Sequence, residues 1–256
     1  METNFLMHLP LNNLNFYCFV FGATLAQYNL HYMTKKIAVR DSARLAWSLQ
    51  NRNIHLALLI TGICLIIYSL FSFHLRHYII LSVMGLIAFI YSFPVLPLKE
   101  RRRIKDYGLI KILTLALLWT LVTVWFPVVN FSLDNILFLF IFFKRFLFMF
   151  VLCLLFDMRD MEIDREQHIH TIPVIAGRAG SYYLSYAVLF LFALLCVAQY
   201  YFFGDAAILA AMLLSAICTF IIIEITKKNN SDYIYLAGID GMMLLQSLLV
   251  YLVIKF

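Results

Sequence analysis

Long apolar segments separated by short polar clusters run through almost the whole chain, and they constrain its fold more than any other feature. Cutting at the polar clusters leaves eight segments, each close to the ~20 residues that a helix needs to cross a bilayer. They cover residues 11–33, 53–73, 77–98, 108–130, 135–156, 181–203, 206–226 and 233–254. With 64% hydrophobic residues, the chain has more apolar surface than one soluble core can bury. We therefore expect an all-α, polytopic transmembrane helix bundle of about eight spans, forming one domain over residues 1–256.

Basic residues are distributed unevenly among the connecting segments, which predicts the orientation of the bundle. Lys and Arg in short loops stay on the cytoplasmic side of a membrane. One set of connections carries fifteen of them, whereas the opposite set carries only Arg76 and Lys255. We therefore expect the acidic segment near residue 160 to be cytoplasmic, in an inner or plasma membrane. The same bias, with attraction to anionic lipid, accounts for the net charge of +6, so nucleic-acid binding is not indicated.

The segment FDMRDMEIDREQ, residues 156–167, places five carboxylates directly after an apolar span. On a continuous helix turning ~100° per residue, Asp157, Asp160 and Asp164 lie within an arc of about 60°. Like charges this close repel unless a cation lies between them, and carboxylate oxygens suit Mg²⁺. Mg²⁺ uses one or two protein carboxylates and fills its other positions with water and substrate phosphates. The pattern fits a magnesium-bound diphosphate; the alternative is a solvated loop, the ordinary role of a charge run.

The stretch that follows, HIHTIPVIAGRAG at residues 168–180, is rich in residues that interrupt helices. It holds Pro173 and two glycines, Gly177 and Gly180. We therefore expect a loop that ends just before the next apolar span. His168 and His170 alternate in sequence, so their side chains would diverge on a helix, and we interpret them as loop residues without a metal role.

The acidic segment and its continuation resemble the second aspartate-rich motif of the UbiA superfamily of intramembrane prenyltransferases. That motif has an Asp-x-x-x-Asp pair followed by Arg and a Thr-Leu-Pro-Val-x-x-Gly-like run, to which FDMRDMEIDR and TIPVIAG are similar. Two shorter pieces agree in order: Tyr91 with two prolines before Lys99, and Lys111 with Trp119 and Pro127 in the next span. The resemblance covers roughly residues 15 to 256.

The resemblance implies a helix bundle around a central cavity, with two aspartate-rich motifs facing each other at its cytoplasmic mouth. It also implies a reaction in which Mg²⁺ binds a prenyl diphosphate and the prenyl group passes to a lipophilic acceptor, such as an aromatic ring or quinone precursor. Carried over to this chain, the metal ligands are Asp160 and Asp164, and the catalytic set is Asp157, Asp160, Asp164 and Asn29. The predicted substrate-binding residues are Lys99, Arg165, Tyr91, Lys111, Arg145 and His31.

The first aspartate-rich motif departs from the family pattern. The family has Asn-Asp-x-x-Asp where this chain has Asn29-Leu30-His31-Tyr32-Met33. Leu30 and Met33 cannot bind Mg²⁺, so only Asn29 remains of this half of the site. His31 offers a hydrogen bond to a phosphate in their place. A second hypothesis follows, that the chain is a catalytically impaired relative that only binds a lipid diphosphate or quinone.

Ionisable residues also occur inside the apolar segments. Lys144 and Arg145 lie nine to ten residues into their span, near mid-bilayer, where charged groups face the interior of a bundle. We predict that Arg145 forms a buried pair with Asp240 of the last span. Such a pair either fixes helix register or contacts substrate, and a small transporter that uses it is a third hypothesis.

Overall fold

The computed structural model describes residues 1–34, 50–92, 108–128, 135–166, 168–229, 231 and 233–255, and helices dominate these ranges. No β-strand occurs in them, so the all-α prediction is confirmed. The chain divides into two compact units, which are described separately. The smaller unit is Asn12–Tyr78, and the larger one combines Met1–Leu11 with Ile79–Phe256.

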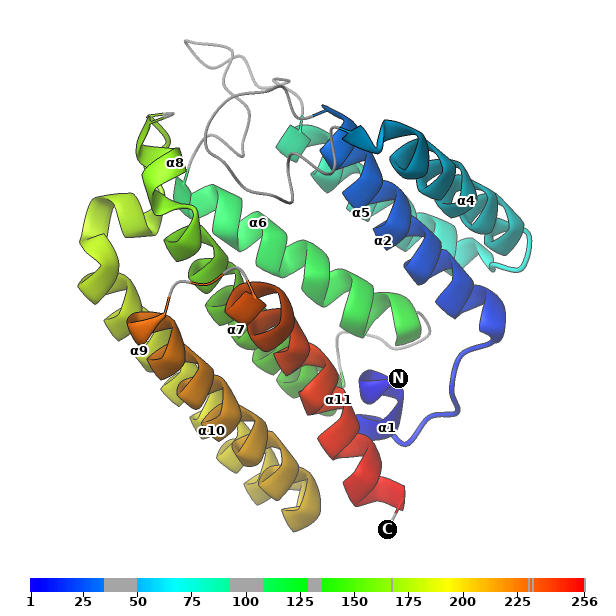
Figure 1. Cartoon of the computed structure of the whole chain (residues 1–256). Coiled ribbons are helices and arrows are strands. Elements are labelled where there is room, and N and C mark those ends of the chain that lie inside the picture. Colours follow the sequence, from blue (N-terminus) through cyan, green and yellow to red (C-terminus); the bar gives the residue numbers. More distant parts are fainter. Residues whose placement is uncertain are drawn as a thin grey trace. The chain divides into compact units, whose positions relative to one another are not determined.

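The helices follow the predicted segments closely (Figure 1). Within the described ranges, six helices are long and apolar enough to span a membrane, and α2 and α5 supply the remaining two of the eight expected segments. In chain order the helices are α1 (Glu2–Leu6), α2 (Leu14–Thr34), α4 (Arg52–Leu70), α5 (Leu75–Ser92), α6 (Gly108–Thr120), α7 (Ile136–Arg159), α8 (Met161–Glu166), α9 (Ile172–Phe203), α10 (Ala206–Lys228) and α11 (Asp240–Lys255). A π-helical segment, η2 (Leu121–Trp125), and a short 3₁₀ turn, η3 (Phe126–Val128), extend α6, and a π-helical segment, η4 (Ile234–Ile239), precedes α11.

Two glycines allow α2 and α4 of the smaller unit to pack backbone against backbone. A Cβ atom on Gly22 would lie 2.8 Å from the carbonyl oxygen of Gly62, and one on Gly62 would lie 2.7 Å from that of Gly22. Small residues that permit such close approach are typical of helix pairs in membranes, where packing replaces the hydrophobic effect as the driving force.

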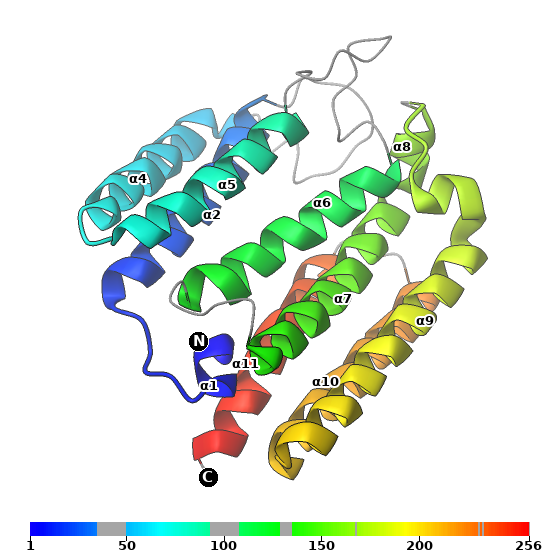
Figure 2. The same cartoon turned by 180° about the vertical axis from the view of Figure 1, so that it is seen from behind.

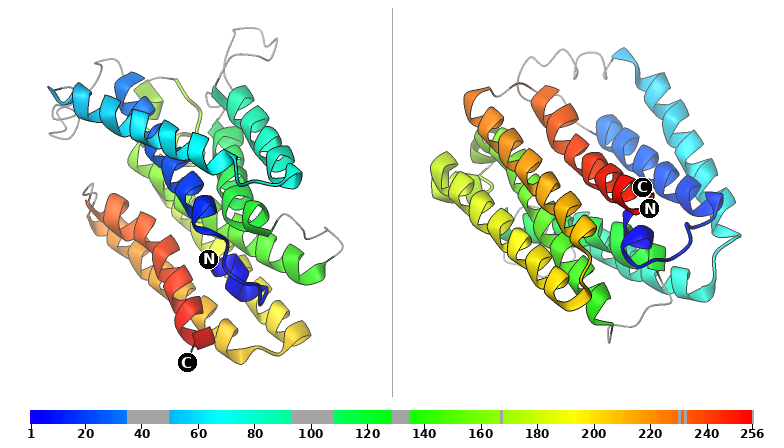
Figure 3. Two further views of the ribbon diagram at one scale, coloured as in Figure 1. Left: turned by 90° about the vertical axis from the view of Figure 1, so that its right-hand side faces the viewer. Right: turned by 90° about the horizontal axis from the view of Figure 1, so that it is seen from below.

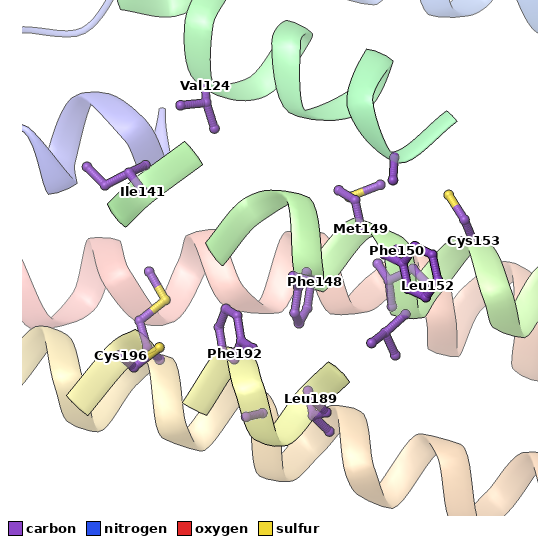
Figure 4. Close-up of a cluster of buried hydrophobic side chains, with 14 of the residues drawn as sticks. Val124, Ile141, Phe148, Met149, Phe150, Leu152, Cys153, Leu189, Phe192 and Cys196 are labelled. Atoms are coloured by element: carbon purple, nitrogen blue, oxygen red, sulfur yellow. The ribbon is translucent and has the colours of Figure 1, made fainter. Parts of the chain in front are cut away.

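In the larger unit, α7 is the most buried of the candidate spans, and it packs against both α6 and α9 (Figure 2). The bundle continues from α9 to α10 and from α10 to α11, as seen from below in Figure 3. Phe148 of α7 and Phe192 of α9 pack against each other in the apolar core, with their rings tilted by 43° and the ring centroids 5.6 Å apart (Figure 4). Apart from Lys144, Arg145 and its last turn, α7 is apolar on all sides, which suits a helix surrounded by neighbours.

A buried polar network ties the short N-terminal helix α1 to this bundle. Arg145 of α7 forms an ion pair with Glu2 of α1 and donates a hydrogen bond of 2.9 Å to Gln246 of α11. Gln246 in turn donates to Ser215 of α10 at 3.1 Å. The predicted pair between Arg145 and Asp240 is therefore wrong. The sequence showed that Arg145 needs a buried partner, but not that a residue more than 140 positions earlier would provide it.

The start of α9 also differs from the prediction. Residues from Ile172 onward are helical, where a loop was expected up to the span. Pro173 is suited to the first turn of a helix because its missing N–H is not needed there. Gly177 then adopts φ 71° and ψ 172°, which kinks the chain between this first turn and the span. His168 and His170 lie in the connection before α9, outside any helix, as expected.

Candidate active site

The acidic segment is divided between two helices. α7 ends at Arg159, Asp160 has the non-helical angles φ −87° and ψ 5°, and α8 begins at Met161. The prediction of one continuous helix is therefore wrong. Because the turn at Asp160 changes the direction of the chain, the three aspartates do not form the expected stripe.

Instead, Asp157 and Asp164 converge on a lysine from another helix. The Lys111 ammonium, in the first turn of α6, lies 2.8 Å from Asp157 Oδ1 and 3.3 Å from Asp164 Oδ2. Both aspartates are buried, with 5% and 6% of their surfaces exposed. Figure 1 shows why the three meet, since α8 lies beside the start of α6 and the end of α7. We call Lys111, Asp157 and Asp164 the carboxylate–lysine cluster.

The cluster carries more negative than positive charge and has an unused oxygen atom. Asp157 Oδ2 is buried and has no hydrogen-bond partner in the described part of the chain, and the buried Thr171 hydroxyl lies close enough to Asp164 to favour its charged form. Burial raises the pKa of the Asp164 carboxyl, and the Lys111 ammonium opposes this shift. Two carboxylates against one ammonium leave a net charge of −1 when all three are ionised, so the cluster can accept a further cation.

This set of donors fits Mg²⁺. Carboxylate and hydroxyl oxygens are hard ligands, and Mg²⁺ in phosphate sites is held by one or two carboxylates, with water and phosphate completing its shell. Asp157, through its free oxygen, and Asp164 would hold the ion. In the described ranges, no three Asp, Glu, His or Cys side chains are grouped closely enough to enclose a metal by themselves.

Close backbone packing holds Thr171 at this site. A Cβ atom on Gly108, the first residue of α6, would lie 2.0 Å from the carbonyl oxygen of His170 and 2.2 Å from the Cα atom of Thr171. Only glycine permits this approach between the start of α6 and the start of α9.

Gly108→Ala is therefore expected to push the His170–Thr171 segment away from α6 and weaken the cluster. We expect a free energy of unfolding lower by about 1–3 kcal/mol, the usual cost of overpacking. Thermal unfolding in detergent measures the change. Gly85→Ala is the matched control, because a Cβ atom there meets nothing within 4 Å. Equal stability of the two variants would contradict the packing argument.

The other acidic and basic residues of the segment point elsewhere. Arg159 donates two hydrogen bonds to Asp160, of 2.8 and 3.0 Å, and its guanidinium lies 5.1 Å from the ring centre of Phe156. Arg165 forms an exposed ion pair with Glu162 at 2.9 Å. Asp160 thus belongs to a separate ion pair, and the metal role predicted for it stays a prediction.

The remaining predicted site residues are less fully described. Tyr91, near the end of α5, interacts electrostatically with Lys111. Lys99 lies outside the described residues, and His31 is described only as part of helix α2. Asn29 is buried in the smaller unit, where its Oδ1 and the Nδ1 of His55 are 2.7 Å apart. Arg145 lies in the buried network described above.

Three residues at or near these positions were not predicted as site residues. His55 had no signal, because a single histidine at the start of an apolar segment matches no motif. Thr171 was noted only as part of the motif, and Gly108 as the edge of a span. Their roles depend on contacts between helices, which sequence spacing does not report.

The fold and cluster together define a class of protein: an integral membrane helix bundle with a buried, negatively charged site at the end of one of its spans. Residues 40–237 match the family model described as UbiA prenyltransferase family. The chain therefore belongs to the UbiA prenyltransferase family, as its second aspartate-rich segment predicted. Membership implies membrane prenyltransferase activity, and family enzymes generally use Mg²⁺ bound by aspartate-rich motifs. Searches of curated proteins and of solved structures gave no match.

Proposed function

We propose that this chain transfers a prenyl group from a prenyl diphosphate to a lipophilic acceptor of the aromatic or quinone-precursor type, with Mg²⁺ as cofactor. The observation that carries the proposal is the carboxylate–lysine cluster, which places two buried carboxylates and an ammonium group at the end of an apolar helix. A prenyl diphosphate likewise combines a charged head group with an apolar hydrocarbon tail, so it matches a charged cluster at the end of an apolar helix. From the distribution of basic residues, we further propose that the cluster faces the cytoplasm.

The chemistry requires stabilisation of a leaving group. As the bond between the prenyl carbon and the diphosphate oxygen breaks, negative charge develops on the diphosphate. Bound Mg²⁺ would neutralise part of this charge as a Lewis acid. Asp157 and Asp164 would hold the diphosphate's cation in place, and the Lys111 ammonium is close enough to both carboxylates to contact the same head group. Asp157 and Asp164 are buried and the Lys111 side chain is only 17% exposed, which limits access of water that would otherwise compete with the acceptor.

The alternative is a relative that binds a lipid diphosphate or quinone without turnover. It is favoured by Leu30 and Met33, which replace the two aspartates of the first motif, and by Asn29, whose side chain is engaged with His55 inside the smaller unit. A transporter that uses Arg145 and Asp240 is not supported, because Arg145 is paired with Glu2.

One experiment separates transfer from binding. Protein reconstituted in lipid nanodiscs receives Mg²⁺, prenyl diphosphates of several chain lengths and a panel of phenolic and quinone-type acceptors. We expect release of diphosphate together with a prenylated product detectable by mass spectrometry, and we expect both to stop on removal of Mg²⁺ with a chelator. Saturable binding of prenyl diphosphate without release would support the alternative instead, and absence of both would contradict each proposal.

A further inference from the structure

Lys144 is a buried cation for which the proposed reaction has no role. It lies in the first half of α7, and only 2% of its surface is exposed. Its neighbour Arg145 is paired with Glu2, whereas Lys144 forms no direct ion pair or hydrogen bond within the described ranges and its charge interacts with Glu2 and Arg145 only at longer range. An ammonium group has three N–H donors, and burying them inside a membrane span without acceptors is strongly unfavourable.

Two small cavities adjoin Lys144, one on the side of α9 and α10 and one on the side of α1 and α11. The first is also lined by Gln199, Asp205 and Met212, and has a volume of ≈ 10 Å³. The second, also ≈ 10 Å³, is lined by Glu2, Gln246 and again Met212. This is close to the smallest space that holds one water molecule, and it is too small for an organic ligand.

The first cavity also contains an acceptor that matches the unused donors of Lys144. Gln199 is 5% exposed, and its Oε1 atom is buried without a hydrogen-bond partner in the described part of the chain. A buried acceptor without a protein partner, Gln199 Oε1, and the 2% exposed Lys144 side chain therefore line the same space. Buried water occurs where it satisfies such groups, whereas apolar cavities stay dry.

We propose that the two cavities form a hydration site in which water molecules join Lys144 to its surroundings. In the first cavity, a water accepts a hydrogen bond from the Lys144 ammonium and donates one to Gln199 Oε1. In the second cavity, a water accepts a hydrogen bond from Lys144. It donates one either to the carboxylate of Glu2 or to the amide oxygen of Gln246. The site extends the hydrogen-bond network of Arg145 to α9. It also allows Lys144 to be buried next to Arg145, although both side chains carry a positive charge.

Radiolytic labelling in ¹⁸O water tests this site with a natural reporter. X-rays convert bound water to hydroxyl radicals that oxidise nearby sulfur atoms, and Met212 lines both cavities while being only 2% exposed. Met149 is an equally buried control at 3% that lines neither cavity. In the full chain in nanodiscs, we expect Met212 to take up label several-fold faster than Met149. Equal labelling rates of Met212 and Met149 would overturn the proposal. A cavity filled by an anion instead of water would give this result, because it would hold no water to form labelled radicals.

Two variants link the label to the polar side chains. Lys144→Leu removes the donor common to both cavities and is expected to lower the Met212 rate to that of Met149. Gln199→Leu alters only the first cavity and is expected to lower the rate partially, so it provides the test if Lys144→Leu does not fold. An unchanged Met212 rate in Gln199→Leu would show that the water is not held by this acceptor and would overturn the assignment of the first cavity.

Discussion

Replacing Asp157 by Asn is expected to lower the rate of prenyl transfer by about 10²–10³-fold, the usual effect of removing one group that stabilises developing charge. Asp157 contacts Lys111 at 2.8 Å, and its second oxygen is buried and unpartnered, so it is the best placed carboxylate to hold a cation. Asp164→Asn is expected to have a similar effect. Initial rates of diphosphate release at saturating Mg²⁺ provide the measurement.

Controls on the neighbouring turn make this result specific. Glu162→Gln removes the same charge from α8, but Glu162 is solvent-exposed and, among the described residues, paired with Arg165 alone. The activity of this variant should therefore stay close to that of the unmodified chain. Asp160→Asn is expected to cost less than Asp157→Asn, because Asp160 is occupied by Arg159. The reverse order would favour the metal pair inferred from the motif, Asp160 and Asp164, over the pair assembled around Lys111.

Replacing Arg145 by Met is expected to lower the free energy of unfolding by about 3–5 kcal/mol, because it leaves the Glu2 carboxylate buried without its partner. The variant also deprives Gln246 of a hydrogen-bond donor. Denaturant titration or thermal unfolding in a mild detergent provides the measurement. Arg165→Met is the matched control, and its exposed ion pair should contribute no more than about 1 kcal/mol.

A double variant distinguishes loss of the pair from loss of packing. If the unpaired Glu2 carboxylate causes most of the destabilisation, the double variant Glu2→Gln with Arg145→Met should be more stable than Arg145→Met alone. The effects of the two substitutions would then be non-additive. A double variant as unstable as the sum of the two single variants would contradict the ion pair as the origin. Activity need not change in parallel, since the network lies outside the carboxylate–lysine cluster.

The aspartate segment shows how far sequence reasoning extended to the site. Its motif identified the family and the chemical character of the residues, and Lys111 of the preceding span, predicted to bind substrate, lies beside two of its aspartates. The assumption of a continuous helix failed at Asp160, where a single turn redirected α8. The helical period predicts which side chains share a face only as long as the helix is continuous. Because the helix breaks at Asp160, Asp164 lies beside Asp157 and Lys111, and Asp160 is paired elsewhere.

By itself the sequence determined the class of fold and the family. The length of the apolar segments predicts the membrane spans, and the order of neighbouring residues in the aspartate-rich motif identifies the family. Those properties depend on residues close together in the chain. Only the tertiary structure decided that Lys111 lies between Asp157 and Asp164, and that Glu2 pairs with Arg145. Such pairs join helices far apart in sequence, so they depend on how each helix is rotated, where it ends and how closely glycines let it approach its neighbour.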